Sequence, residues 1–161
     1  PFIYRVHEEP DTEKVNALNK FLFNFGYKIK SNKEKVYPKA FAEVLEKVKG
    51  REEEMVVSNL ILRTLKVARY ESENKGHFGI ASKYYCHFTS PIRRYPDLFI
   101  HRIISKYLKY DYTMSEKQVE FYNKVAENDA KQSSDREKIA TKNRQLNTHK
   151  HHQKEKRLLK K

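Results

Sequence analysis

The sequence predicts a mostly α-helical fold with a few short β-strands. Apolar residues recur every three or four positions along most of the chain, which is the spacing of one helix face. Glycine follows two of these stretches directly, as expected where a helix ends. With 161 residues and an apolar fraction of 38%, we expect one compact domain with a solvated extension.

The N-terminal part predicts two amphipathic helices. The first covers residues 11–25, with an aspartate in the N-cap position and Gly26 just past its end. The second begins near Pro38, whose missing N–H does no harm in a first turn, and stops at Gly50. Residues 27–29, between the two helices, are a candidate short strand.

The rest of the apolar pattern predicts three more helices and one irregular segment. A third helix is expected over about residues 52–69. Residues 77–90 concentrate aromatic side chains and favour a strand or an ordered loop. Helical periodicity returns over residues 98–108 and again over 115–139.

The positive charge of the chain points to a polyanionic partner. The formal net charge is +13 at pH 7, which favours nucleic acid ahead of a membrane surface. Residues 141–161 have no apolar period and carry eight basic residues against one acid, Glu155. We therefore place a boundary near Ala140, with a domain over 1–140 and a disordered basic tail over 141–161; a specific binding element is the alternative for the tail. No apolar run reaches membrane-spanning length, and we expect no membrane partner.

Cysteine and histidine usage argues against a metal or disulfide site. Cys86 is the single cysteine, which excludes an intrachain disulfide or a thiolate zinc site and suits a cytoplasmic location. His77, His87 and His101 have neither paired ligand spacing nor a neighbouring carboxylate, which favours packing roles. From pattern alone, we expect no metal ligands in this chain.

The densest chemical segment is residues 87–97, directly before an apolar helix. Ser90 and Pro91 suit an N-cap and a first helical position, which would put Arg93 and Arg94 beside a helix N-terminus. Free backbone N–H groups and the helix dipole favour an anion there, and guanidinium groups match phosphate oxygens with two parallel donors. The segment therefore predicts a phosphodiester ligand.

Neighbouring side chains fit the same ligand. The hydroxyls of Thr89 and Ser90 can donate to phosphate oxygens, and unpaired bases can stack on nearby aromatic rings, namely Tyr84, Tyr85, Phe88 and Tyr95. In the alternative interpretation, Arg93 or Arg94 forms an ordinary ion pair with Asp97 and the aromatic rings belong to the core. The residue pattern by itself leaves both interpretations open.

The same residues carry a resemblance to a known family. Several stretches within about residues 1–140 closely resemble the signature of the ribonuclease R and ribonuclease II (RNB-type) family: Pro1–Glu8, Ile61–Lys66, Glu73–Ala81, Tyr85–Leu98 and His101–Arg102. The match decays after Ala140, as a truncated or frameshifted gene would produce. Residues 1–140 would then be a partial exoribonuclease catalytic domain.

The resemblance implies a fold and an activity. The chain would be the helical C-terminal portion of an α/β catalytic domain in a 3′ to 5′ exoribonuclease, which hydrolyses single-stranded RNA to nucleoside 5′-monophosphates. Family members hold Mg²⁺ in a cluster of aspartates, which belongs to a missing N-terminal catalytic half, and they continue into a C-terminal OB-type domain. Because this chain has no Asp-rich motif, we expect it not to cut RNA alone. The alternative function is a noncatalytic module that binds single-stranded RNA.

The resemblance also implies roles for single residues. Arg93 matches the arginine that contacts the scissile phosphate. The positions expected to bind RNA are Arg94, Tyr85, His87, Thr89, Ser90, Tyr95 and His77. Pro91 and Gly79 are expected to shape the backbone, and Asp97 to orient an arginine rather than bind metal. The oligomeric state is left open.

Overall fold

In a computed structural model of the chain, residues 1–32 and 35–158 are described, with side chains omitted for residue 32 and from residue 149 onward. The chain forms two compact units. The N-terminal unit comprises Tyr4–Arg69 and Glu73–Cys86. The C-terminal unit comprises Pro1–Ile3, Tyr70–Ser72 and the chain from His87 onward.

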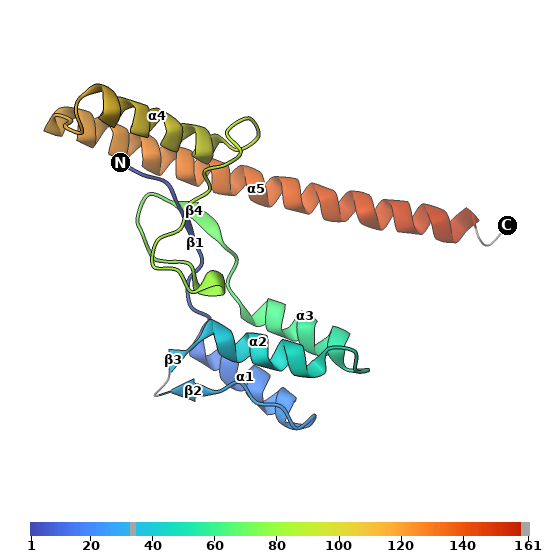
Figure 1. Ribbon diagram of the computed structural model, residues 1–161. Coiled ribbons are helices and arrows are strands. Elements are labelled where there is room, and N and C mark those ends of the chain that lie inside the picture. The colour runs from blue at the N-terminus through green and yellow to red at the C-terminus, as the bar shows by residue number, and fades with distance from the viewer. Residues whose placement is uncertain (33–34, 159–161) are drawn as a thin grey trace. The chain divides into compact units, whose positions relative to one another are not determined.

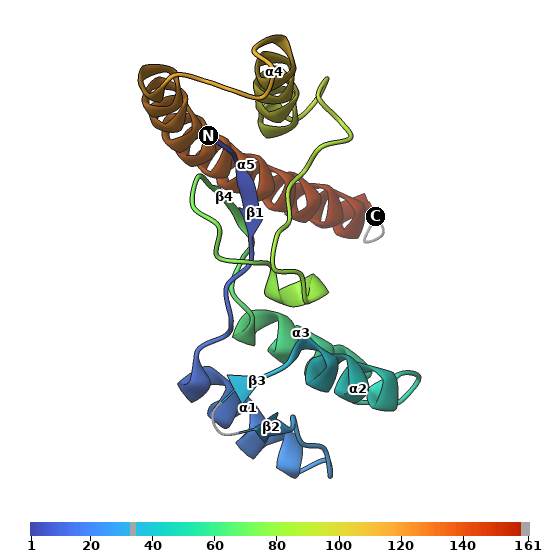
Figure 2. The ribbon, with the colours of Figure 1, turned by 60° about the vertical axis from the view of Figure 1, so that its left-hand side comes forward.

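The N-terminal unit is built on three helices. Helices α1 and α2 both pack against α3 (Figure 1), and a single turn of 3-10 helix, η1, lies against α2 (Figure 2). The elements of this unit are β1 (Tyr4–Val6), α1 (Thr12–Phe23), β2 (Ser31–Asn32), β3 (Lys35–Val36), α2 (Pro38–Val48), α3 (Glu54–Thr64) and η1 (Phe78–Ile80). The mostly helical fold with short strands is confirmed, although α3 is shorter than the helix expected over residues 52–69.

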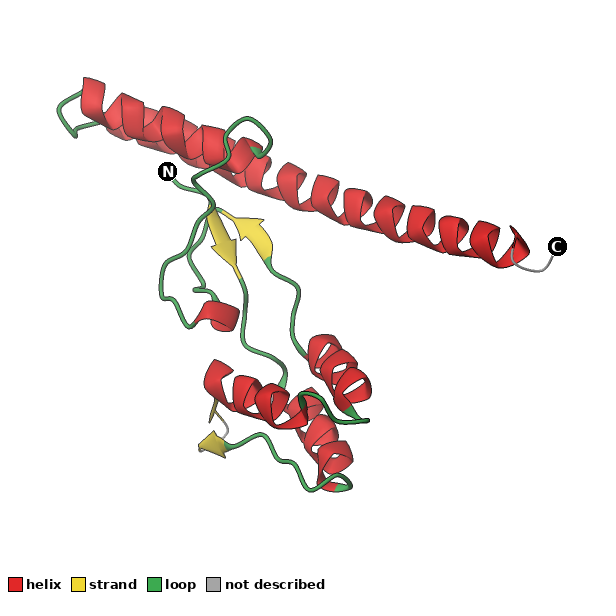
Figure 3. Cartoon of the chain, turned by 45° about the vertical axis from the view of Figure 1, so that its right-hand side comes forward, coloured by secondary structure: helices red, strands yellow, loops and turns green. Residues whose placement is uncertain are grey.

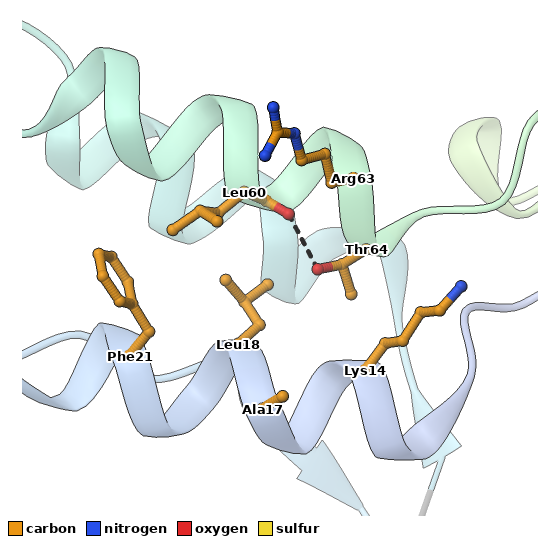
Figure 4. A pocket seen from close by; sticks show the side chains of 7 residues that line it. All are labelled: Lys14, Ala17, Leu18, Phe21, Leu60, Arg63 and Thr64. Atoms are coloured by element: carbon orange, nitrogen blue, oxygen red, sulfur yellow. Dashed lines mark hydrogen bonds between the residues drawn. The ribbon is translucent and has the colours of Figure 1, made fainter.

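One apolar core holds these helices together. Its buried members come from every helix of the unit and from the segments between them: Val15, Leu18, Leu22, Tyr27, Ile29, Val36, Ala40, Phe41, Val44, Val48, Val57, Ile61 and Phe78. Burying one such side chain contributes about 1.5–3 kcal/mol. Figure 4 shows a cavity of about 270 Å³ between α1 and α3, where Leu18 and Phe21 face Leu60 and the cations Lys14 and Arg63 lie along the rim.

Glycines end the first two helices, as the sequence predicts. Gly26 follows α1 and Gly50 follows α2, and each has a φ of 76°. A side chain with a Cβ is strained in this left-handed conformation, so glycine is the residue that stops a helix and reverses the chain there.

The strand predicted over residues 27–29 is wrong. Tyr27 and Ile29 are buried, but the segment is irregular. The Asn19 side chain of α1 takes the place of a partner strand: the Ile29 N–H donates to Asn19 Oδ1 at 2.7 Å, and Asn19 Nδ2 donates to the Ile29 carbonyl at 3.2 Å. The short antiparallel pair lies slightly later, with Ser31 opposite Val36 in β2 and β3.

The C-terminal unit is a helix pair. Helices α4 (Tyr95–Lys109) and α5 (Glu116–Leu158) pack together (Figure 3). Phe99, Ile100 and Ile103 of α4 are buried, as are the small residues Ala126 and Ala130 of α5, which let the two backbones approach closely. Within strand β4 (Arg69–Glu71) the chain passes from one unit into the other.

Helix α5 does not stop at the predicted boundary near Ala140. Its backbone is helical as far as Leu158, whereas the sequence predicts a disordered tail from residue 141. Residues 141–158 contain neither glycine nor proline and are rich in Lys, Arg and Gln, which favour a helix even without an apolar face. No helix in the described part of the chain is both long and apolar enough to cross a bilayer.

A buried serine ties α5 to β4. The Ser134 hydroxyl accepts from the Tyr70 N–H at 2.8 Å and donates to the Tyr70 carbonyl at 3.1 Å. Ser134→Ala removes both of these hydrogen bonds to the buried Tyr70 backbone, so we expect it to lower the free energy of unfolding by about 1–3 kcal/mol. Urea unfolding followed by circular dichroism measures this loss. The half-buried neighbour Ser133 is the matched control, and equal losses in Ser133→Ala and Ser134→Ala would contradict the assignment.

Candidate functional site

Two arginines lie at the start of α4, but the helix begins later than predicted. Arg94 is the N-cap residue and Pro96 lies in the first turn, where its missing N–H is harmless. The predicted start at Ser90 and Pro91 is wrong, because these residues belong to a preceding turn in which the Ser90 carbonyl accepts from the N–H groups of Arg93 and Arg94 at 3.3 and 3.1 Å. The predicted position of both arginines beside a helix N-terminus is confirmed.

A buried carboxylate holds Arg94 in place. Asp97 is 0% exposed, and its Oδ2 accepts from Arg94 Nη2 at 2.8 Å and Nε at 3.2 Å. The same oxygen accepts from the Ser90 N–H at 2.8 Å, which fastens the turn to the helix. The ion pair with Asp97 that the alternative interpretation predicts is therefore present for Arg94, and it also fixes the direction of that guanidinium.

Arg93 differs from its neighbour. Its side chain is exposed, and no carboxylate in the described part of the chain pairs with it. Arg93 and Arg94 both line a cavity of about 810 Å³ within the C-terminal unit. The lining residues are Tyr70, His87, Arg93, Arg94, Tyr95, Pro96, Asp129, Gln132, Ser133, Arg136, Glu137, Ala140 and Arg144. Four guanidinium groups against two carboxylates make this cavity suited to an anion.

The two acids of the cavity lie on α5. Burial raises the pKa of Asp129, while the Tyr95 hydroxyl and the positive charge of Arg102 act in the opposite direction. Oδ2 of Asp129 is shielded from solvent and has no hydrogen-bond partner among the described residues. The four arginines that line the cavity outnumber its two acids, so the cavity stays electropositive.

Histidines near the cavity are held by neighbouring groups. His87 Nδ1 lies 2.8 Å from the Tyr70 hydroxyl, which fixes the ring at the cavity wall. His101 Nε2 lies 2.8 Å from the Phe88 carbonyl, and the two rings stack with centroids 4.3 Å apart. His101 therefore has the packing role that the sequence predicts, and it covers one face of the Phe88 ring.

The cavity unites only part of the predicted site. His87, Arg93, Arg94 and Tyr95 line it. Thr89 and Ser90 belong to the same unit but do not line it, whereas His77 and Tyr85 belong to the N-terminal unit, where their ring centroids are 5.0 Å apart. The RNA-related role of every one of these residues, inside the cavity or outside it, stays a prediction.

Sequence reasoning missed the contribution of α5. Asp129, Ser133, Arg136, Ala140 and Arg144 line the cavity and recur at intervals of three or four, so they lie on one helix face. The spacing of these residues can be read from the sequence, but a polar helix face is ordinarily exposed to solvent. The packing of α5 against α4 is what makes this face a wall of the cavity.

His77 takes part in a histidine pair that the sequence did not predict. The His7 and His77 rings meet edge to face, with centroids 5.1 Å apart. His7 Nδ1 accepts from the Gly79 N–H at 3.0 Å, so this nitrogen is unprotonated. His7 Nε2 and His77 Nδ1 are shielded from solvent, without a hydrogen-bond partner among the described residues. Gly79 leaves room for this contact, because a Cβ there would lie 2.8 Å from His7 Nδ1; its expected backbone-shaping role stays a prediction.

This pair predicts acid sensitivity of the N-terminal unit. Burial lowers the pKa of His7 from its ordinary 6.5, as does the charge of Arg5, while the Lys66 backbone acts in the opposite direction. The pKa of His77 is lowered by burial and by the charges of His7 and Arg5. A base whose pKa is lower in the folded chain binds its proton more readily when unfolded, so stability falls as the pH drops below 6.5.

Thermal unfolding at about pH 7 and about pH 5.5 tests this, because carboxylates titrate mainly below that range. We expect a lower midpoint at the acidic pH and a smaller difference in His7→Asn, which lacks the titrating ring. An unchanged pH dependence in His7→Asn would contradict the role of the pair.

The described residues do not fit a divalent metal ion. They contain no group of three or more His, Cys, Asp or Glu side chains that is close enough to hold one. The two acids of the large cavity share it with four arginines, whose charge opposes a cation.

Comparison with known proteins gives a consistent result. The RNB domain family matches residues 1–110. The chain is 44% identical to ribonuclease R of Thermotoga maritima over 140 residues, which are 87% of this chain and 20% of that protein. It is 50% identical to ribonuclease R of Aquifex aeolicus over 109 residues, which are 68% of this chain and 15% of that protein.

A solved structure has the same fold. Mycoplasma genitalium RNase R in complex with ribose methylated single-stranded RNA is 32% identical to this chain, with a TM-score of 0.79. The similarity covers 92% of this chain and 23% of the other. The chain thus spans about a fifth or less of the length of these two curated relatives.

Proposed function

The chain belongs to the RNB domain family, and we propose that it forms part of a hydrolytic 3′ to 5′ exoribonuclease that shortens single-stranded RNA. The observation that carries this proposal is the arginine-lined cavity beside the start of α4. Similarity to ribonuclease R over 140 residues supports the exoribonuclease in preference to a noncatalytic RNA-binding module.

In this proposal Arg93 is the catalytic residue. Phosphoryl transfer builds negative charge on the nonbridging oxygens, which a positioned guanidinium stabilises. Arg93 lines the cavity and has no carboxylate partner in the described part of the chain, so its donors are available to a phosphate. Arg94 is the fixed neighbour: Asp97 holds its Nε and Nη2 and sets the direction of the remaining N–H groups.

The remaining predicted residues would guide the RNA strand. Tyr95 is 46% exposed at the cavity wall and offers a ring on which a base can stack. His87 lies on the same wall, and Thr89 and Ser90 follow it in the chain as hydroxyl donors. His77 and Tyr85 lie in the N-terminal unit, and contact with RNA is proposed for them separately from the cavity.

Mg²⁺ is the cofactor that the family implies, and it would supply Lewis-acid stabilisation of the reacting phosphate. Because the described acids do not cluster, we place the metal-binding aspartates in parts of the relatives that this chain does not span. An N-terminal catalytic portion and an OB-type domain would be its covalent neighbours. RNA turnover in the cytoplasm is the corresponding cellular role.

A chimera tests the proposal. Residues 1–140 of this chain replace the corresponding segment of Thermotoga maritima ribonuclease R, to which the chain is similar over 140 residues. We expect Mg²⁺-dependent shortening of a 5′-labelled RNA from its 3′ end, and its loss in the chimera with Arg93→Ala. A folded chimera without activity, or one that Arg93→Ala leaves unchanged, would contradict the proposal.

Experiments on the 161-residue chain by itself distinguish RNA binding from RNA cleavage. We expect it to bind single-stranded RNA, more weakly as salt rises, without cutting it. Mg²⁺-dependent shortening by the chain alone, abolished by Arg93→Ala, would show that the metal-binding acids lie within this chain after all.

A further inference from the structure

A second cavity in the C-terminal unit carries basic and aromatic side chains. This groove, about 480 Å³ in volume, lies between α4 and the first half of α5. Its cations are Arg102, Lys106 and Lys109 of α4, and its rings include Tyr95 and Tyr122. No acidic side chain of the described residues lines it.

The three cations form one continuous strip. They are spaced by four and then three positions, which places them on one face of α4 over a length of about 10 Å. None of the three forms an ion pair with a carboxylate in the described part of the chain. The helix dipole favours Lys106 and Lys109 in the last turn, and the charge of Arg102 also acts on Asp129 of α5.

Aromatic rings lie under two of these cations. The Arg102 guanidinium carbon is 6.0 Å from the Tyr95 ring centroid, and Lys106 Nζ is 5.9 Å from that of Tyr122. Cations interleaved with aromatic rings are what a single-stranded nucleic acid requires, because the cations contact phosphates while the rings stack on bases.

The groove adjoins the arginine cavity. Tyr95 lines both of them, so a strand leaving Arg93 can pass over this ring into the groove. We propose that the groove between α4 and α5 is a second binding site for single-stranded RNA, which holds nucleotides adjoining those in the arginine cavity. This proposal rests on the proposed function, and the continuity through Tyr95 favours RNA over an acidic protein segment.

Two oligoribonucleotides test the proposal on the complete 161-residue chain. One 5′-fluorescent oligouridylate is just long enough for the arginine cavity, and the other is several nucleotides longer. Fluorescence anisotropy measures their affinity for the chain and for R102A/K109A. The control is K117A/K131A, which removes the same charge from exposed lysines of α5 that line neither cavity.

We expect R102A/K109A to weaken binding of the long oligonucleotide about tenfold and to reduce its salt slope by about 0.7 for each phosphate that is no longer neutralised. The short oligonucleotide should bind R102A/K109A with its original affinity, and K117A/K131A should bind both probes as the unmodified chain does. Tyr122→Ala should weaken the long probe as well, whereas Tyr122→Phe, which keeps the ring, should not.

These measurements distinguish failure of the groove proposal from failure of the proposed function. If Arg93→Ala weakens both probes while R102A/K109A weakens neither, the groove is not an RNA site and the proposed function stands. If R102A/K109A weakens the binding of short and long probes equally, the proposal that the groove binds RNA is also wrong. If Arg93→Ala has no effect either, the proposed function fails too. Displacement of the long probe by polyglutamate at equal charge concentration would assign the groove to an acidic protein segment instead.

Discussion

Asp97→Ala is expected to destabilise the C-terminal unit by about 3–5 kcal/mol, the usual cost of removing one partner from a buried ion pair. The Asp97 side chain is 0% exposed and accepts three hydrogen bonds, two from Arg94 and one from the Ser90 N–H. Its removal leaves the Arg94 guanidinium partly buried without its counter-charge and releases the turn that precedes α4.

Urea unfolding of the chain measures this loss as a lower midpoint. Asp97→Asn should fall between the unmodified chain and Asp97→Ala, because its amide oxygen still accepts a hydrogen bond but carries no charge. Asp135→Ala is the matched control: Asp135 pairs with Lys138 at 3.2 Å on an exposed face of α5, and its loss should change stability by about 0.5 kcal/mol or less. Equal effects of Asp97→Ala and Asp135→Ala would mean that Asp97 does not organise the site.

Arg93→Ala is expected to weaken single-stranded RNA binding by roughly 10- to 100-fold, the equivalent of about 1.5–3 kcal/mol for a charged hydrogen bond. Stability should stay unchanged, because Arg93 is exposed and has no carboxylate partner among the described residues. Arg93→Lys keeps the charge but loses the paired donors, so an intermediate affinity is expected.

Fluorescence anisotropy of a labelled oligoribonucleotide measures these affinities, and Lys117→Ala controls for the loss of one positive charge from an exposed position in the same unit. If Lys117→Ala and Arg93→Ala weaken binding equally, the effect is one of net charge and Arg93 has no special position. Thermal unfolding of each variant separates weaker RNA binding by a folded chain from unfolding of the chain itself.

Much of the helical framework follows from local sequence. The apolar spacing places α1 and α2 nearly where they lie, because a helix face and a glycine stop are properties of a few neighbouring residues. Residues 27–29 show the limit of this reasoning. Buried apolar residues alternate there as in a strand, yet Asn19 of α1 supplies the hydrogen bonds, and a side chain ten positions away is invisible to a local pattern.

In the candidate site, too, some features follow from the local sequence and others depend on tertiary packing. The sequence by itself determined the family, the helical framework and the pair of arginines at the start of α4, because each depends on the order of residues along a short stretch. Only the tertiary structure decided that Asp97 holds Arg94 while Arg93 has no carboxylate partner in the described part of the chain, and that α5 completes the cavity with Arg136 and Arg144. Hydrogen-bond partners and cavity walls depend on which helix faces pack together, and packing is set by the whole core.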